Sequence, residues 1–138
     1  MHCKVTGSFT TWYDDEGRIH RDDGPAVITS TQQNWFRHGQ QHREDGPAYI
    51  HINGSRKWCV NGKLHRDDGP AIEIFGGETV WYRQGLIHRD DGPAIIDRHG
   101  NQIWYQYNIP HRLDGPAYEW KGGRTDWVIN GKIGRAHV

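Results

Sequence analysis

The sequence has little of what indicates a disulfide-rich or zinc-binding protein, a nucleic-acid-binding protein, or a membrane or secreted protein. Its 138 residues include only 2 cysteines, and Cys3 and Cys59 lack the spacing of a disulfide framework or a zinc ribbon. The 17 basic and 17 acidic residues cancel, which does not indicate general binding to nucleic acid or to an anionic membrane. No apolar run approaches the roughly 18 residues of a membrane-spanning helix, and "MHCKVTGS" lacks the apolar core of a signal peptide. We therefore expect a cytoplasmic protein.

Aliphatic residues are also scarce, whereas large aromatic residues are not. Hydrophobic residues make up 34% of the chain and the mean hydropathy is −0.92, yet there are 7 Trp, 6 Tyr and 3 Phe. Because each aromatic side chain buries a large area, a few of them per structural unit can hold a thin structure together. The composition predicts a shallow, aromatic core.

The chain is a tandem repeat with a period of 23 residues. Six tryptophans are each separated by that interval: Trp12, Trp35, Trp58, Trp81, Trp104 and Trp127. Five near-copies of the phrase HRDDGPA follow them, and their histidines and last aspartates are His20, His42, His65, His88, His111, Asp23, Asp45, Asp68, Asp91 and Asp114. The five phrases hold nine carboxylates and five arginines. If the phrases share one edge of the fold, that edge is mildly acidic.

Turn-forming residues divide each unit into two short strands. A strand after the tryptophan ends at a turn such as Asn61-Gly62, a dipeptide typical of tight hairpins. The Gly-Pro of the phrase leads into a second strand, because proline fits a strand entrance but cannot donate to a ladder. No segment has helical periodicity. We predict an all-β fold and a single domain: an elongated antiparallel β-meander of about six tandem hairpin repeats, in one twisted sheet of about twelve strands.

The two ends differ from the repeated middle. Residues 1–11 form the expected N-terminal cap, which includes a capping strand within residues 1–8. Residues 12–126 form five full repeats, and residues 127–138 form a partial repeat that caps the C-terminus. In the last repeat Gly134 stands where histidine belongs, and the phrase does not recur.

The repeated His, Arg and Asp allow a chemical and a structural interpretation. An enzyme needs one converging site, whereas successive copies lie about 9.6 Å apart along a sheet. Metal binding by the histidine column fails for the same reason, although a His and Asp pair within one phrase stays open. The structural interpretation predicts that each histidine bonds to a following turn, that each aspartate accepts backbone N–H groups, and that each arginine pairs with a carboxylate of the adjacent unit. We expect no catalytic residue, no metal and no cofactor.

The tryptophans have a structural role in this interpretation and also offer a candidate binding surface. As a column they are most simply core. If the array instead leaves aromatic and basic side chains along a groove, they can stack a nucleobase or grip a peptide. Residues two positions after a tryptophan would lie beside its ring, and Trp120 breaks the repeat pattern. The candidate binding residues are Trp35, Arg37, Trp81, Arg83, Trp104 and Trp120.

The unit resembles the MORN repeat and its relatives in YwqK-type antitoxin proteins. The shared pattern is aromatic-aromatic-x-x-Gly-x-x-His, a glycine-marked corner and a hairpin turn. The specific form, W[YF]xxGxxHRxDGPA, is similar to repeats in bacteriophage and bacterial proteins and covers residues 12–133. One departure is that arginine stands where MORN units usually have glycine after the histidine. The resemblance implies a protein-binding scaffold.

Three functions follow as alternatives. The leading hypothesis is a non-enzymatic protein-interaction scaffold, a phage or bacterial accessory protein that binds a host or bacterial protein, for example as a counter-defence inhibitor in the host cytoplasm. A second is a binder that sequesters a small nucleotide signal. A third is a hydrolase that uses one His-Arg-x-Asp phrase. A homodimer would cover apolar area that a thin sheet leaves exposed.

Overall fold

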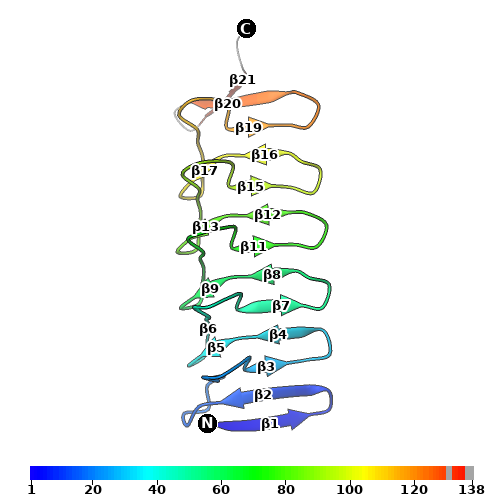
Figure 1. The fold of residues 1–138 in the computed structure, drawn as a ribbon. Helices are drawn as coiled ribbons and strands as arrows, with labels where there is room; N and C mark the ends of the chain where they lie inside the picture. The colour runs from blue at the N-terminus through cyan, green and yellow to red at the C-terminus, as the bar shows by residue number, and fades with distance from the viewer. Residues whose placement is uncertain (130–131, 136–138) are drawn as a thin grey trace.

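The computed structural model describes the backbone of residues 1–129 and 132–135. All regular secondary structure in these ranges is β-strand, and paired strands are antiparallel. The strands stack in one direction, so the molecule is an elongated array with β1 at one end and β20 near the other (Figure 1). This confirms the predicted all-β meander. The described ranges contain no helix long and apolar enough to cross a membrane.

One open sheet of thirteen strands runs the length of the array. Its first and last strands each have a neighbour on one side only, so the sheet does not close on itself. In sheet order the strands are β1 (His2–Thr6), β2 (Phe9–Tyr13), β3 (Val27–Ile28), β4 (Gln32–Asn34), β7 (Tyr49–His51), β8 (Arg56–Lys57), β11 (Ile72–Glu73), β12 (Thr79–Val80), β15 (Ile95–Ile96), β16 (Gln102–Ile103), β19 (Tyr118–Glu119), β20 (Thr125–Ile129) and β21 (Lys132–Arg135).

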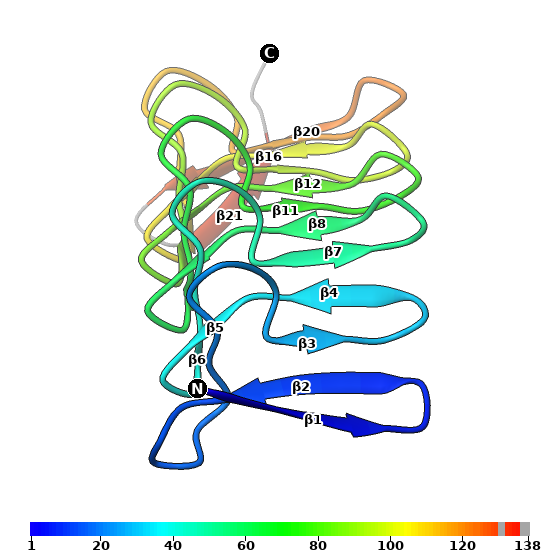
Figure 2. The same ribbon diagram turned by 60° about the horizontal axis from the view of Figure 1, so that its bottom comes forward.

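Four short hairpins form a second row beside this sheet. Figure 2 shows them on the side opposite the tips of the main hairpins. They are β5 (Phe36–Arg37) with β6 (Gln40–Gln41), β9 (Cys59–Val60) with β10 (Lys63–Leu64), β13 (Tyr82–Arg83) with β14 (Leu86–Ile87), and β17 (Tyr105–Gln106) with β18 (Ile109–Pro110). A central unit therefore has four strand segments, where the sequence analysis predicted two.

The tryptophan is the residue at which the chain passes from one row to the other. The N–H of Trp81 donates to the carbonyl of Ala94, which directly precedes β15 in the main sheet. The carbonyl of Trp81 accepts the N–H of His88, which directly follows β14 of the short hairpin. Because its two backbone groups bond to different rows, the predicted continuous tryptophan strand is split into β12 and β13.

The short hairpins have two-residue turns that require positive φ at both positions. Arg37 pairs with Gln40, which leaves His38 and Gly39 as the loop, with φ values of 46° and 83°. Positive φ at both residues is the condition for a type I′ turn, whose twist matches that of the flanking strands. Asn108 occupies the glycine position of the fourth turn with φ of 67°, a conformation that asparagine tolerates better than most residues.

The core is shallow, as predicted, but its fully buried positions are small. Among the described residues no large side chain is fully buried. The alanine that ends each repeated phrase is 0% exposed in all five copies: Ala26, Ala48, Ala71, Ala94 and Ala117. The tryptophans are half-buried. The fully buried column therefore consists of a small apolar side chain, and the carbonyl of each of these alanines accepts the N–H of the tryptophan of its own unit.

The two ends of the array are simpler than its middle. β1 pairs with β2 along five residues and supplies the predicted N-terminal capping strand. At the other end β20 continues through Trp127 and pairs with β21, where Trp127 lies opposite Gly134. The predicted C-terminal cap, 127–138, lies partly outside the described residues.

Candidate functional site

The five repeated phrases form a row of loops that we call the corners: the first at 20–26, then 42–48, 65–71, 88–94 and 111–117. In each corner the arginine folds back over the tryptophan of its own unit, with its Cζ 3.8–4.6 Å from the ring centroid. In the third corner Arg66 Nε donates to Asp68 at 3.2 Å and Nη1 donates to the carbonyl of Pro70 at 3.1 Å. The other corners repeat these contacts.

These contacts correct the predicted partners of the corner residues. Each corner arginine pairs with the aspartate two residues later in its own corner, where the sequence analysis expected a carboxylate of the adjacent unit. Each of these aspartates correspondingly accepts from the arginine Nε, where we expected backbone N–H donors. The reason is geometric: the guanidinium lies on the indole face, between its own Asp and Pro.

Each of the first four corner histidines joins its unit to the next. His88 Nδ1 lies 3.2 Å from the backbone N of Tyr107, the first residue of the next type I′ turn. Since that N–H can only donate, Nδ1 accepts and Nε2 carries the proton, which it donates to Asp90 at 2.7 Å. The same pair of contacts occurs at His20, His42 and His65. The sequence analysis expected each histidine to bond to the turn that follows it; in these four copies the ring bonds instead to the acid of its own corner and to the type I′ turn of the next unit.

Concave grooves lie between consecutive corners; the sequence analysis considered a groove of aromatic and basic side chains but did not place it between corners or give it acidic rims. Their volumes are about 570, 630, 370 and 800 Å³ from the first to the fourth. The second groove is typical: Asp45 and Pro47 come from one corner, Trp58 lies between β8 and β9, and Asp67 and Asp68 come from the next corner. The only sequence signal for the grooves was the recurrence of paired acids at one edge every 23 residues.

The fourth groove, between the fourth and fifth corners, differs from the rest. Leu113 stands where the other corners have a carboxylate and is 90% exposed. His111 therefore has no acidic residue two positions later. It is also exposed, whereas His20, His42 and His88 are buried. The groove is also the largest of the four. This end of the row is therefore more apolar and more open.

Five of the six candidate binding residues line these grooves. Trp35 and Arg37 line the first groove, Trp81 and Arg83 the third, and Trp104 the fourth. The expected placement of Arg37 and Arg83 beside the rings is replaced by contacts with acids: Arg37 Nη1 lies 3.7 Å from Glu44, and Arg83 Nη2 lies 2.9 Å from Asp90.

Trp120 lies away from the grooves, at the tip of the hairpin formed by β19 and β20. Its ring stacks on Tyr118 with centroids 5.6 Å apart, and its Nε1 donates to Asp126 at 2.8 Å. Arg124 lies over the Trp120 ring, with its Cζ 5.2 Å from the centroid. These contacts hold the indole in place within its own hairpin.

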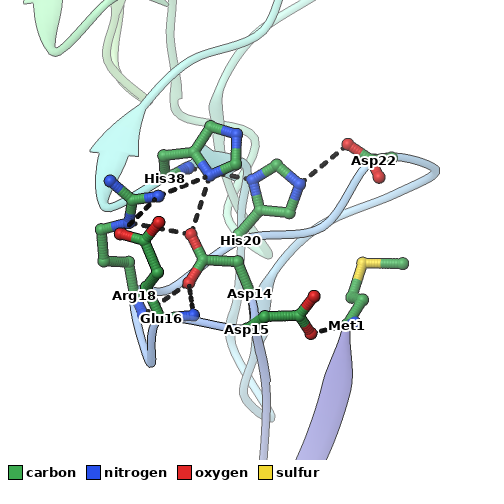
Figure 3. Close-up of polar contacts among 8 residues, drawn as sticks. All are labelled: Met1, Asp14, Asp15, Glu16, Arg18, His20, Asp22 and His38. Atoms are coloured by element: carbon green, nitrogen blue, oxygen red, sulfur yellow. Dashed lines mark hydrogen bonds and ion pairs between the residues drawn. The ribbon is translucent and has the colours of Figure 1, made fainter.

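The first unit has an extra residue, and its longer turn gathers a cluster of polar side chains (Figure 3). Asp14 is buried; its Oδ1 accepts the N–H groups of Glu16 and Arg18, and its Oδ2 lies 2.9 Å from Arg18 Nε and 2.7 Å from His38 Nδ1. The hydrogen bond from His38, together with those from Arg18, holds the pKa of the Asp14 carboxyl well below its usual value of 3.8.

This cluster brings Asp14, His20 and His38 close enough together to be tested as a metal site. The two imidazoles stack with centroids 4.1 Å apart and an interplanar angle of 21°, so their in-plane lone pairs do not converge on one point. His20 Nδ1 already accepts the N–H of His38, and the Arg18 guanidinium supplies the positive charge beside Asp14. The cluster therefore fits a structural network better than a metal centre.

Two groove carboxyls have pKa values below the usual value for aspartate. Arg43 holds the pKa of Asp45 below its usual value through a hydrogen bond and its charge. Arg83 and then His88 do the same for Asp90. By contrast, burial raises the pKa of the Cys59 thiol, which is 4% exposed in the slot of an aromatic residue. Cys59 is accordingly a packed, unreactive side chain.

Comparisons with family models, with curated proteins and with solved structures find no match to this chain. The similarity to the MORN repeat therefore stays a prediction from the sequence pattern, and the function has to be argued from the geometry of the corners and grooves.

Proposed function

We propose that this protein is a non-enzymatic binding protein that takes an extended segment of a partner protein along its row of corner grooves. The observation that carries the proposal is the repetition of one groove, with an indole in its wall and carboxylates on its rims, along a single edge. A ligand that spans several units can contact each groove in the same way. Repeat arrays commonly present extended binding surfaces of this kind.

The contacts of the histidines favour binding over catalysis. In the first four corners both ring nitrogens are engaged, one by the corner's own acid and the other by the next turn. A general base needs a ring nitrogen free to take a proton from substrate. The exposed carboxylates also disfavour a nucleotide, because they would repel its phosphates. If the similarity to phage repeats holds, the partner is a host protein, and a counter-defence role would follow.

The test compares two double variants with the same change in charge. Asp68→Asn with Asp91→Asn removes two groove charges but keeps an oxygen that can accept from Arg66 and Arg89. Asp15→Asn with Glu78→Gln removes two charges outside the grooves. We expect covalent crosslinking in a bacterial lysate to capture a protein with the unmodified chain and with the second variant, and to lose it with the first. Capture that is equal for both variants, or absent throughout, would reject the proposal.

A further inference from the structure

The corner row presents negative charge to solvent although it contains arginines. The nine corner carboxylates have side-chain exposures of 64–88%, whereas the five corner arginines have exposures of only 22–24%. The arginines are withdrawn against the indoles, and their donors are used by Asp and by the Pro carbonyl. The charged groups exposed to a partner at the groove rims are therefore mainly carboxylates.

Each groove also has a negative formal balance. Summing the charged side chains that line them gives −1 for the first, third and fourth grooves and −2 for the second. The first acid of each regular corner accepts from a histidine Nε2–H, which brings no charge if the ring is neutral. Glu44 and Asp90 also contact an arginine, whereas Asp22 and Asp67 contact only the histidine. A cationic side chain is the complement that these rims lack.

The groove spacing sets a second requirement. Consecutive corners are separated by two strands, or about 9.6 Å at the usual strand spacing. A polyproline II segment has three residues per turn and rises about 3.1 Å per residue, so it advances about 9.3 Å before the same side faces the surface again. Over the three intervals between four grooves the mismatch is only about 1 Å. In an extended β-strand, successive side chains point to opposite sides, so side chains three residues apart also point to opposite sides. A β-strand therefore cannot direct every third side chain toward the grooves.

We propose that the grooves bind a polyproline II segment of a partner protein that carries a basic side chain at every third residue. This inference rests on the proposed function and names the partner's chemistry. The basic side chains reach the carboxylates at the groove rims, and the apolar rings of the segment lie against the exposed parts of the indoles, as in other recognition of proline-rich segments by aromatic grooves. At the fourth groove the exposed Leu113 offers an additional apolar contact.

Two synthetic peptides of twelve residues test the period separately from the charge. The first consists of four Pro-Pro-Arg triplets. The second has the same composition, eight prolines and four arginines, but its arginines occupy alternate positions in its first eight residues. Binding is measured by fluorescence anisotropy of a dye on the peptide terminus. We expect the triplet peptide to bind about tenfold more tightly, because two or more exposed ion pairs, each worth a factor of about two to five, are out of register in the second.

The double variants provide matched controls on the protein side. Asp68→Asn with Asp91→Asn should weaken binding of the triplet peptide by about tenfold, whereas Asp15→Asn with Glu78→Gln should leave it unchanged. Thermal melts of both variants establish that they are folded. Equal affinity for the two peptides, or equal affinity of the two variants for the triplet peptide, would overturn the inference.

The two experiments distinguish failure of this inference from failure of the proposed function. If neither peptide binds but crosslinking still captures a protein that the Asp68→Asn and Asp91→Asn variant loses, the grooves bind a partner of another chemistry and only the further inference falls. If that capture also fails, the proposed function falls with it.

Discussion

The tips are the turns that join the two strands of each main hairpin, such as β7–β8 and β11–β12. The row of corners and the row of tips lie on opposite sides of the same array, yet residues at the corners vary less from repeat to repeat than residues at the tips. Corner positions repeat His, Arg, Asp, Gly, Pro and Ala with few changes. At the tips, the residues at one equivalent position along the row are Ile52, Phe75, Arg98 and Lys121. The two rows have the same period and the same neighbours, so the difference needs a physical cause.

The difference between the two rows follows from whether side-chain or backbone atoms form the hydrogen bonds between one unit and the next. At the corners one of the joining groups is a side chain: the imidazole of His65 accepts the N–H of Gln84 at 2.9 Å. It acts beside a backbone bond from the N–H of Arg66 to the carbonyl of Tyr82 at 3.4 Å. At the tips the backbone supplies at least one partner: the N–H of Ile52 donates to the carbonyl of Thr31 at 2.8 Å, and that of Phe75 donates to Ser55 Oγ at 2.8 Å. A backbone N–H is present whatever the side chain, so the tip residue is free to vary.

Enlarging a corner alanine should give the largest loss of stability. Ala71 is 0% exposed, so the larger side chain of the Ala71→Leu variant has to displace its neighbours, at a cost of about 2–3 kcal/mol. Urea unfolding measures this loss. The Ile52→Leu substitution at a tip keeps the side-chain volume and serves as the control. A change below about 0.5 kcal/mol for Ala71→Leu would mean that the alanine column is not tightly packed.

Removing a corner histidine should cost somewhat less. The His88→Ala substitution leaves the N–H of Tyr107 and the carboxylate of Asp90 without this partner, which we expect to lower stability by about 2 kcal/mol. The His65→Ala substitution should have a similar effect, because its contacts are the same in kind. His99, at a tip, is the matched control, and the His99→Ala substitution should change stability by less than about 0.5 kcal/mol.

Thermal or urea unfolding of the three histidine variants decides between two interpretations of the corners. Similar losses for His65 and His88 agree with a repeated structural contact. Loss of a turnover activity from one histidine variant alone, without a loss of stability, would instead support a single catalytic corner.

The long first turn should show the clearest dependence on pH. The folded-state pKa of Asp14 is lowered, so its contribution to stability is complete above the unfolded value of 3.8 and is lost as the pH falls below that value. The Asp14→Asn substitution keeps an oxygen for the turn N–H groups but removes the charge. We expect unmodified protein to be more stable than this variant at about pH 6, and the difference to shrink at about pH 3.

The Asp15→Asn substitution is the control for that measurement, because the Asp15 side chain is 94% exposed and lies in the same turn. Its effect on unfolding should be small at both pH values. A difference between unmodified protein and the Asp14→Asn variant that stays constant with pH would contradict the assigned role of the carboxylate.

The tips should be the most tolerant region of the array. Ile52 and Phe75 are 76% and 72% exposed, and their inter-unit hydrogen bonds use backbone N–H groups. The Ile52→Ser and Phe75→Ser substitutions should therefore change the free energy of unfolding by less than about 0.5 kcal/mol each. A loss above about 1 kcal/mol from either variant would show that the tip side chains pack after all.

Much of the architecture could be predicted because it depends on contacts within one unit. The 23-residue period, the turn dipeptides and the lack of helical periodicity were sufficient for the all-β meander and for the N-terminal capping strand. The division of each tryptophan strand could not be predicted, because it requires knowing that Trp81 bonds to Ala94 through its N–H and to His88 through its carbonyl. Residue types alone do not specify which neighbour each backbone group meets.

The sequence by itself determined the repeat, its β-strand character and the residues that would recur at each corner, because local turn geometry selects those residues. The tertiary structure alone decided that each corner arginine lies over its own indole, that the histidines join consecutive units, and that grooves with acidic rims open between corners. The physical reason is that these features depend on how far apart adjacent units stack and on which way each side chain folds across that gap.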